Sequence, residues 1–203
     1  FGIDLCIGSE ADQPITQRQM MFAPFYLMDA FDGAQIKGDS IQRPLITANE
    51  LVVDATPEPD ESDWMPTPLQ CSLLLFILTA AATIYGIRRR TGLWGIDLFL
   101  FGIAGIVGCV LAFLALFSQH PAVSSNFLLL VFHPGQLLFL PYIIYCVRKG
   151  KKCWYLTLNL IILTLFIVLF PVIPQRFDFA VVPLALCLLI RSVSNLIVTS
   201  KKK

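Results

Sequence analysis

Residues 73–90 read LLLFILTAAATIYGIRRR, an uncharged apolar run that stops at three consecutive arginines. The apolar stretch begins a few residues earlier, at Leu69. The hydrocarbon core of a bilayer takes roughly 20 apolar residues at helical rise, and a segment in lipid has to satisfy its backbone polar groups internally. Residues 69–87 are therefore predicted to form a membrane-spanning helix.

Four further segments show the same pattern, at about 95–117, 127–147, 154–172 and 179–198. The third of them is interrupted by His133, Pro134 and Gly135. The whole chain of 203 residues is 56% hydrophobic and only 14% charged, whereas soluble domains are about 25% charged. The predicted fold class is an all-α polytopic membrane protein with five transmembrane helices, preceded by a small α+β exoplasmic fragment.

The two parts of the chain carry opposite charge. Residues 1–68 hold twelve acidic and three basic side chains, whereas residues 69–203 hold two acidic and twelve basic ones. Short loops rich in Lys and Arg stay in the cytoplasm. The basic clusters at 88–90, 148–152 and 201–203 all fall at one set of predicted helix ends, so residues 1–68 are expected outside the cytoplasm and the C-terminus inside.

Residues 1–53 have the mixed pattern of an α+β fragment. Thr16 and Gln19 form a capping box, Pro24 is expected to kink or restart the helix, and Gly33 is expected to end it. A hairpin is expected over residues 34–46, with its turn at Gly38–Asp39. Residues 54–68 are acidic and Pro-rich and are expected to form an extended linker. Because about 50 residues bury only a small core, the fragment is expected to be the C-terminal end of a larger domain.

Two stretches resemble a known family. Residues 1–31, FGIDLCIGSEADQPITQRQMMFAPFYLMDAF, resemble the end of the Lnb N-terminal periplasmic domain, and residues 113–142, FLALFSQHPAVSSNFLLLVFHPGQLLFLPY, resemble the accompanying five-helix transmembrane domain. In the second stretch the family's HPxxxxN loop corresponds to His120, Pro121 and Asn126, with Pro134 at the following proline step. The chain is similar to bacterial Lnb-like proteins, particularly those of Bacteroidetes.

The resemblance implies a bacterial inner-membrane protein with its N-terminal part in the periplasm. It also implies a lipoprotein N-acyltransferase, which moves an acyl chain to the α-amine of the lipidated N-terminal cysteine, with its nucleophile upstream of Phe1. The implied partners are membrane lipid and a lipidated lipoprotein. Two alternatives stay open: a membrane anchor for an exoplasmic binding domain, and a transporter of lipids or small molecules.

Asp4 and Asp12 flank a glycine-containing turn near the start of the chain. An acid in such a place can orient a catalytic imidazole, and it can equally close the turn by accepting from backbone N–H groups. Cys6 lies between them, but the neighbouring acids Asp4 and Glu10 disfavour the negatively charged thiolate that a nucleophilic cysteine needs. Cys6 is therefore expected to be a buried apolar residue.

His120 and Asn126 bracket the loop between the second and third predicted helices. They suit contact with a lipid headgroup, or they satisfy helix ends, which is a common use of these residues. His133 lies in the outer part of a span, where an ionisable group is a candidate for function. A broken backbone at that depth is tolerated only against protein or a water-filled cavity, so a cleft is expected there.

Asp97 and Arg191 are predicted to pair near the cytoplasmic ends of the second and fifth helices. Ala104, Gly108 and Ala112 recur every four residues and predict close approach of a neighbouring helix. The sequence contains no pattern of metal ligands or phosphate-binding glycines, so no metal and no cofactor are expected. Its basic clusters lack interleaved aromatic residues on a soluble face, which argues against nucleic-acid binding.

Overall fold

The computed structural model describes residues 1–38, 42–50 and 65–200. The chain divides into two compact units, one made of residues 1–12 and 65–203 and the other of residues 13–64. We call the first the helical unit, and we call its N-terminal segment, Phe1–Asp12, the strap.

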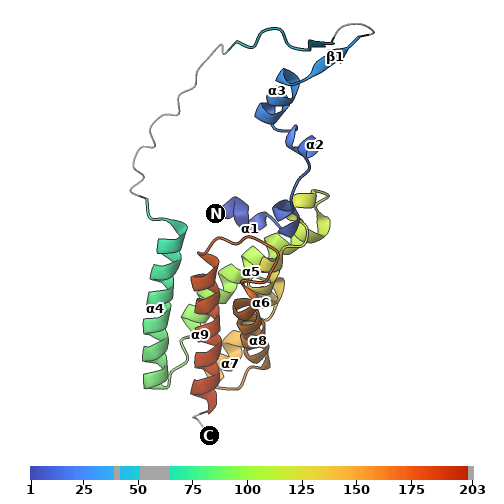
Figure 1. Ribbon diagram of the computed structural model, residues 1–203. Coiled ribbons are helices and arrows are strands. Elements are labelled where there is room, and N and C mark those ends of the chain that lie inside the picture. Colours follow the sequence, from blue (N-terminus) through green and yellow to red (C-terminus); the bar gives the residue numbers. More distant parts are fainter. Residues whose placement is uncertain (39–41, 51–64, 201–203) are drawn as a thin grey trace. The chain divides into compact units, whose positions relative to one another are not determined.

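Three long apolar helices run through the helical unit: α4 (Pro68–Arg89), α5 (Trp94–Phe117) and α9 (Val181–Ser200) (Figure 1). Each is long and apolar enough to cross a bilayer, because 20 helical residues extend about 30 Å. The first, second and fifth predicted spans are therefore confirmed as continuous helices, and their ends agree with the prediction to within two residues.

The third predicted span is not a single helix. It consists of the 3₁₀-helix η3 (Phe127–Leu130), the short helix α6 (Pro134–Leu138) and α7 (Leu140–Lys149), and the chain bends by 72° before α7. Proline lacks an N–H group and keeps the preceding residue out of the helical region. His133, which precedes Pro134, is accordingly extended at φ −134° and ψ 150°. The predicted interruption at His133 is confirmed. The prediction of one helix over residues 127–147 is corrected, because this stretch consists of separate helices joined at a bend.

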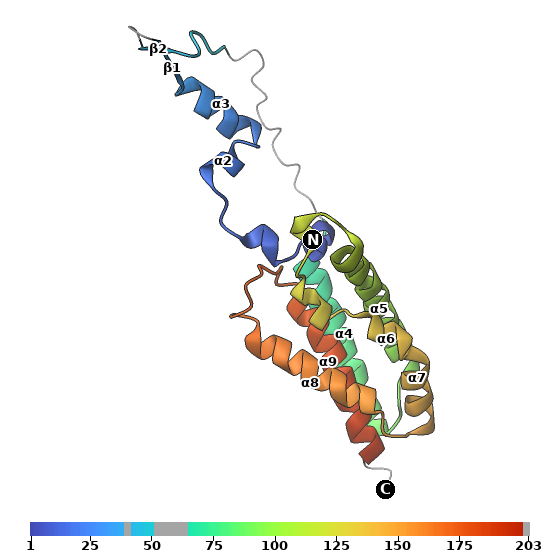
Figure 2. The same ribbon diagram turned by 90° about the vertical axis from the view of Figure 1, so that its right-hand side faces the viewer.

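The fourth predicted span, 154–172, is represented by α8 (Trp154–Leu169), which has 16 residues. Such a helix is about 24 Å long, shorter than the hydrocarbon core of about 30 Å. It ends early because Pro171 cannot continue it. By length and composition, the described residues hold three continuous spanning helices, or four if the bent pair counts as one span. The shorter α8 leads from the basic end toward the loop that precedes α9 (Figures 1 and 2), so the count of five spans stays a prediction.

Basic residues gather at one end of the helical unit. The α4–α5 turn, the α7–α8 turn and the C-terminal end of α9 lie at this end in both views (Figures 1 and 2). The Arg148 guanidinium lies 5.4 Å from the centre of the Trp94 ring. Lys151 donates from Nζ to the Tyr145 hydroxyl at 3.0 Å, and this hydrogen bond raises the pKa of Lys151. Cations beside aromatic rings are typical of a membrane interface. We call this the basic end and the opposite one the strap end.

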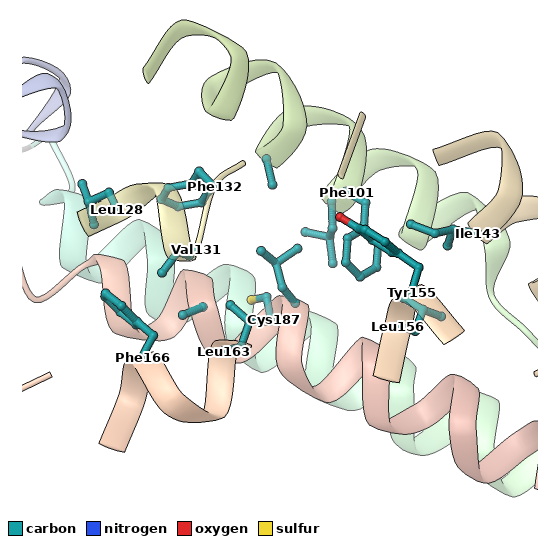
Figure 3. Packing of buried hydrophobic residues seen from close by; sticks show 14 of the residues in the cluster. Phe101, Leu128, Val131, Phe132, Ile143, Tyr155, Leu156, Leu163, Phe166 and Cys187 are labelled. Atoms are coloured by element: carbon teal, nitrogen blue, oxygen red, sulfur yellow. The ribbon is translucent and has the colours of Figure 1, made fainter. Parts of the chain in front are cut away.

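The apolar core of the helical unit lies where α5, α8 and α9 face one another (Figure 3). Phe101 of α5, with Leu163 and Phe166 of α8, is fully buried. The helix α4 packs along α9, whereas α5 packs against α6 and α7. The helices α4 and α5 are joined by a short turn, yet each is supported mainly by a different partner.

The strap contains α1 (Gly2–Cys6) and the 3₁₀-helix η1 (Ser9–Asp12), and another 3₁₀-helix, η2 (Pro121–Val123), precedes η3. The strap belongs to the helical unit, although the sequence grouped it with residues 13–53. The predicted boundary at residue 53 lies outside the described residues, so the division into 1–53, 54–68 and 69–203 stays a prediction.

The second unit has the mixed structure expected from the sequence. Thr16 and Gln19 form the predicted capping box, and Gly33 caps the C-terminal end of the helix that starts at Pro24. Its elements are α2 (Gln17–Met20), α3 (Pro24–Asp32), and the antiparallel pair β1 (Gln35–Lys37) and β2 (Gln42–Pro44). The predicted turn residue Asp39 and most of the predicted linker lie outside the described residues.

Candidate functional site

Two buried amide side chains hold the strap against the loops at the strap end. Asn126 donates from Nδ2 to the Leu5 carbonyl at 2.7 Å. Gln175, in the loop between α8 and α9, donates from Nε2 to the Ile7 carbonyl at 2.9 Å and to Asn126 Oδ1 at 3.2 Å. The Oε1 atom of Gln175 accepts from the Phe127 N–H at 2.8 Å. The two amides therefore bind each other, the strap and the start of η3 together.

Burial gives these hydrogen bonds their importance. Asn126 is 5% exposed and Gln175 is 7% exposed. With the strap docked, both side chains are shielded from water, where an unsatisfied buried polar group costs about 1–3 kcal/mol, and the Leu5 and Ile7 carbonyls supply the acceptors that they need. The docked position of the strap is thus favoured by polar contacts in addition to apolar packing.

The strap also docks through its backbone. The Gly8 N–H donates to the Ala122 carbonyl at 2.7 Å, and Ser9 Oγ donates to the Ser125 carbonyl at 3.1 Å. A Cβ atom at residue 8 would overlap the Ser124 carbonyl oxygen. Because the two backbones approach so closely, only glycine fits at this position.

The two predicted acids have different surroundings. Asp12 accepts from the Arg176 N–H at 2.7 Å through Oδ2, so it fastens the end of the strap to the α8–α9 loop. Asp4 lies exposed on α1. Asp12 thus bonds a backbone N–H of a distant loop and not one of the local turn that one interpretation predicted. The orienting role of either acid toward a catalytic imidazole stays a prediction. Cys6 is half-buried and packs against the core.

His120 and Asn126 lie in the loop that receives the strap. His120 is exposed, and its Nδ1 accepts from the Ala122 N–H at 3.3 Å. Asn126 caps η3, because its Oδ1 accepts from the Leu128 N–H at 2.9 Å. Both residues thus satisfy helix ends, as one of the two interpretations predicted. Their contact with a lipid headgroup stays a prediction.

A second group of polar side chains fills the break in the third predicted span. Gln136 is fully buried and donates from Nε2 to the Val131 carbonyl at 2.7 Å. Asn159 of α8 donates to Ser192 Oγ of α9 at 3.2 Å, and its Oδ1 lies 3.5 Å from Gln136 Nε2. An interrupted helix leaves carbonyls without their helical partners, and here a glutamine side chain satisfies one of them.

Three buried atoms at this break have no hydrogen-bond partner among the described residues. They are His133 Nε2, Gln136 Oε1 and the Tyr155 hydroxyl. The His133 and Tyr155 rings lie 6.2 Å apart, centre to centre. An unpaired polar group in an apolar medium costs several kcal/mol, so this combination of an acceptor, a hydroxyl and a ring nitrogen suits a water molecule or a small polar group.

The predicted pair between Asp97 and Arg191 is confirmed. Arg191 donates from Nε to Asp97 Oδ1 at 2.7 Å and from Nη2 to Asp97 Oδ2 at 3.1 Å. Both side chains are buried, at 1% and 0% exposure. Arg191 also donates to Thr83 of α4 at 3.2 Å, and Asn195 donates to Asp97 at 3.4 Å. This pair joins three spanning helices.

Sequence reasoning missed Gln136, Tyr155, Gln175 and the need for glycine at residue 8. Gln136 carried a usable signal, since it is an amide inside an apolar run and lies three residues after His133. Gln175 stands beside Pro174 in a loop, where an amide is unremarkable. Its role depends on Asn126 and Ile7, which are far away in the chain.

Comparison with known families matches residues 60–203 to the Lnb transmembrane domain. No curated protein and no solved structure matches the chain. The match covers well over half of the chain and includes all the long apolar helices, whereas the strap lies outside it, so the resemblance of residues 1–31 to the Lnb periplasmic domain stays a prediction. The apolar helices and this match together identify a multi-pass membrane protein that belongs to the Lnb transmembrane domain family.

Proposed function

We propose that this chain is the membrane module of a lipoprotein N-acyltransferase. In the proposed reaction, an ester bond between an acyl chain and the glyceryl group of a lipidated cysteine breaks. An amide bond forms at the cysteine α-amine, and the proton that the amine loses ends on the freed glyceryl hydroxyl. The product is a lyso-form lipoprotein. The proposal assigns no nucleophile to this chain.

The observation that carries the proposal is the docking of the strap. The Asn126 and Gln175 amides, with the Gly8 backbone, tie the strap to the loops at the strap end. In the proposal the strap is the part of the periplasmic domain that is fixed to the membrane module, so its docking ties the two parts of the enzyme together. Fixed placement of reacting groups accounts for a large part of many rate enhancements. The glyceryl ester of a membrane-anchored lipid lies near the membrane surface, where the proposal puts the strap end.

The proposed orientation follows from the charges. Basic loops favour the cytoplasm, so the basic end is proposed to be cytoplasmic and the strap end periplasmic, in a bacterial inner membrane. His120, exposed in the loop beside the strap, is proposed to contact the substrate headgroup together with Asn126. His133, with its unpartnered Nε2, is proposed to bind a polar atom of the lipid.

Mass spectrometry of lipoprotein N-termini tests the proposal. A strain without the full-length protein is complemented by wild type or by His120→Ala, Asn126→Ala or His133→Ala. We expect lyso-form N-termini to disappear in the deletion strain, to return with wild type, and to be reduced with the three variants. Insertion of each variant is checked by its level in the membrane fraction.

The outcomes separate the alternatives. Unchanged N-termini in the deletion strain contradict the acyltransferase proposal and favour anchoring or transport. Loss of the lyso-form in the deletion strain, with full rescue by all three variants, retains the acyltransferase but reduces the helical unit to an anchor.

A further inference from the structure

An apolar groove runs along the side of the helical unit between α4 and α5. One part has a volume of about 190 Å³ and is lined by Leu75 of α4, Ile103 and Val107 of α5, and Leu188 of α9. An adjoining part of about 270 Å³ shares Leu75 and Phe99 with the first and reaches Gly95. The two cavities adjoin along α4 and α5 through shared lining residues, and we call them together the groove.

The packing of the helices explains the groove. The helix α4 rests on α9, and α5 rests on α6 and α7, so the two walls are held by different partners. Along α5 the groove extends from Gly95 to Val107, which is about 18 Å at helical rise. One leaflet of hydrocarbon is about 15 Å deep, so the groove has the length of a lipid tail.

The strap contributes to the wall at one end of the groove. Phe1 and Leu5 line the 190 Å³ part, and the carbonyl of the same Leu5 accepts the hydrogen bond from Asn126. The docked strap therefore forms part of the surface that an occupant of the groove touches.

The size and lining of the groove decide what can occupy it. A dry cavity of about 150 Å³ lined by Leu, Ile and Phe binds apolar molecules and excludes water. The two parts together hold about 460 Å³ along about 18 Å, a mean cross-section of about 26 Å², whereas a helix with its side chains is at least 10 Å wide and needs about 80 Å². The half-exposed Phe99 and Ile103 belong to a spanning helix, so the surrounding medium is lipid hydrocarbon.

We propose that this groove binds one acyl chain of a bilayer phospholipid, with the end of the groove lined by Phe1 and Leu5 in contact with the strap. The site is distinct from the polar group at His133, and its occupation does not depend on the acyltransferase proposal.

Photocrosslinking in nanodiscs tests the site. The full-length protein is reconstituted with a phosphatidylethanolamine that carries a diazirine in one acyl chain, and lipid adducts are mapped by peptide mass spectrometry. We expect adducts at Leu75 and Ile103 to exceed those at the lipid-facing Leu74 and Ile106 by about tenfold, the equivalent of about 1.4 kcal/mol.

Matched tryptophan variants make the test specific. Ile103→Trp fills the groove and is expected to lower the Leu75 adduct about tenfold. Ile106→Trp is the control, because Ile106 is 56% exposed against 47% for Ile103 and does not line the groove. If Ile103→Trp does not fold, the pair Leu78→Trp and Leu74→Trp replaces it, since Leu78 lines the groove and both residues are about 60% exposed.

Three results would overturn the proposal. Equal amounts of adduct at the groove and at the lipid-facing positions would show that the groove does not bind lipid preferentially. An unchanged Leu75 adduct in the folded Trp variant would do the same. If a diacylglyceryl lipopeptide with the same diazirine chain labelled the groove and the phospholipid did not, the occupant would be a lipoprotein. Lyso-form production, measured separately in cells, bears only on the acyltransferase proposal.

Discussion

At the scale of single residues, Gly8 is a position in the strap where a side chain has no room. Its N–H bonds to the Ala122 carbonyl, and the space for its Cβ is occupied by the Ser124 carbonyl oxygen. Gly2 lies in the same strap and has no atom within 4 Å of the place for its Cβ. The two glycines therefore form a natural test and control for strap docking.

We expect Gly8→Ala to loosen the strap. The overlap forces a backbone shift that costs about 1–3 kcal/mol, which corresponds to a fall of roughly 5- to 150-fold in hydrogen-exchange protection of the Ser9 amide. Gly2→Ala should leave protection unchanged. Equal protection in the two variants would show that the strap is not held at Gly8.

At the scale of secondary-structure elements, Arg191 of α9 joins two other spanning helices. It binds Asp97 of α5 through two hydrogen bonds and Thr83 of α4 through a third. A buried charge whose partner is removed is strongly destabilising, whereas replacing both partners by apolar residues of similar size is often tolerated.

We expect Asp97→Ala alone to destabilise the protein by about 3–5 kcal/mol, because Arg191 would keep an unpaired buried charge. The double variant Asp97→Leu with Arg191→Leu should recover much of this loss. Thermal unfolding of the purified protein in detergent measures both. A double variant no more stable than Asp97→Ala would contradict the assignment of the loss to the unpaired charge.

The contact between α5 and α6 depends on small residues. A Cβ at Gly108 would lie 2.5 Å from His133 backbone atoms, and one at Gly105 would overlap the Leu137 N–H. The predicted stripe of Ala104, Gly108 and Ala112 is thus correct for Gly108, whereas Gly105 is the second glycine of the contact. Ala104 instead lines the groove beside α4.

We expect Gly108→Ala to lower stability by about 1–3 kcal/mol, since the His133 backbone has to move. Gly95→Ala is the control, because no atom lies within 4 Å of its Cβ position. The measurement is the midpoint of thermal unfolding of each variant against wild type. Equal midpoints for the two variants would show that α5 and the His133 backbone do not approach closely at Gly108.

At the scale of the whole molecule, the bent pair determines the membrane topology. The α7–α8 turn lies at the same end as the α4–α5 turn (Figure 2), which is the arrangement of a pair that crosses the bilayer once. A re-entrant pair would instead return the chain to the strap end.

Reporter fusions test this arrangement. We expect green fluorescent protein to fluoresce when fused after Thr91 or after Gly150, because both follow basic clusters that favour the cytoplasm. Alkaline phosphatase should be active after Ser118. Phosphatase activity after Gly150 would mean that the bent pair re-enters on the strap side.

Local patterns in the sequence were sufficient to predict the continuous spans, the break at His133 to Gly135, the capping box and the grouping of the basic loops. Each of these depends on residues close together in the chain, where hydropathy, proline sterics and charge act directly. The same patterns overestimated the fourth span, because apolar composition continued past the point where Pro171 ends the helix.

The sequence by itself thus determined that this protein is a multi-pass membrane protein with one basic end. The tertiary structure alone decided the placement of the strap, the role of Gln175 and the groove between α4 and α5. These features join residues as far apart as Ile7 and Gln175, or arise where two helices are held by different partners. Contacts of this kind leave no periodic mark on the chain, because they depend on how the packed helices bring distant segments together.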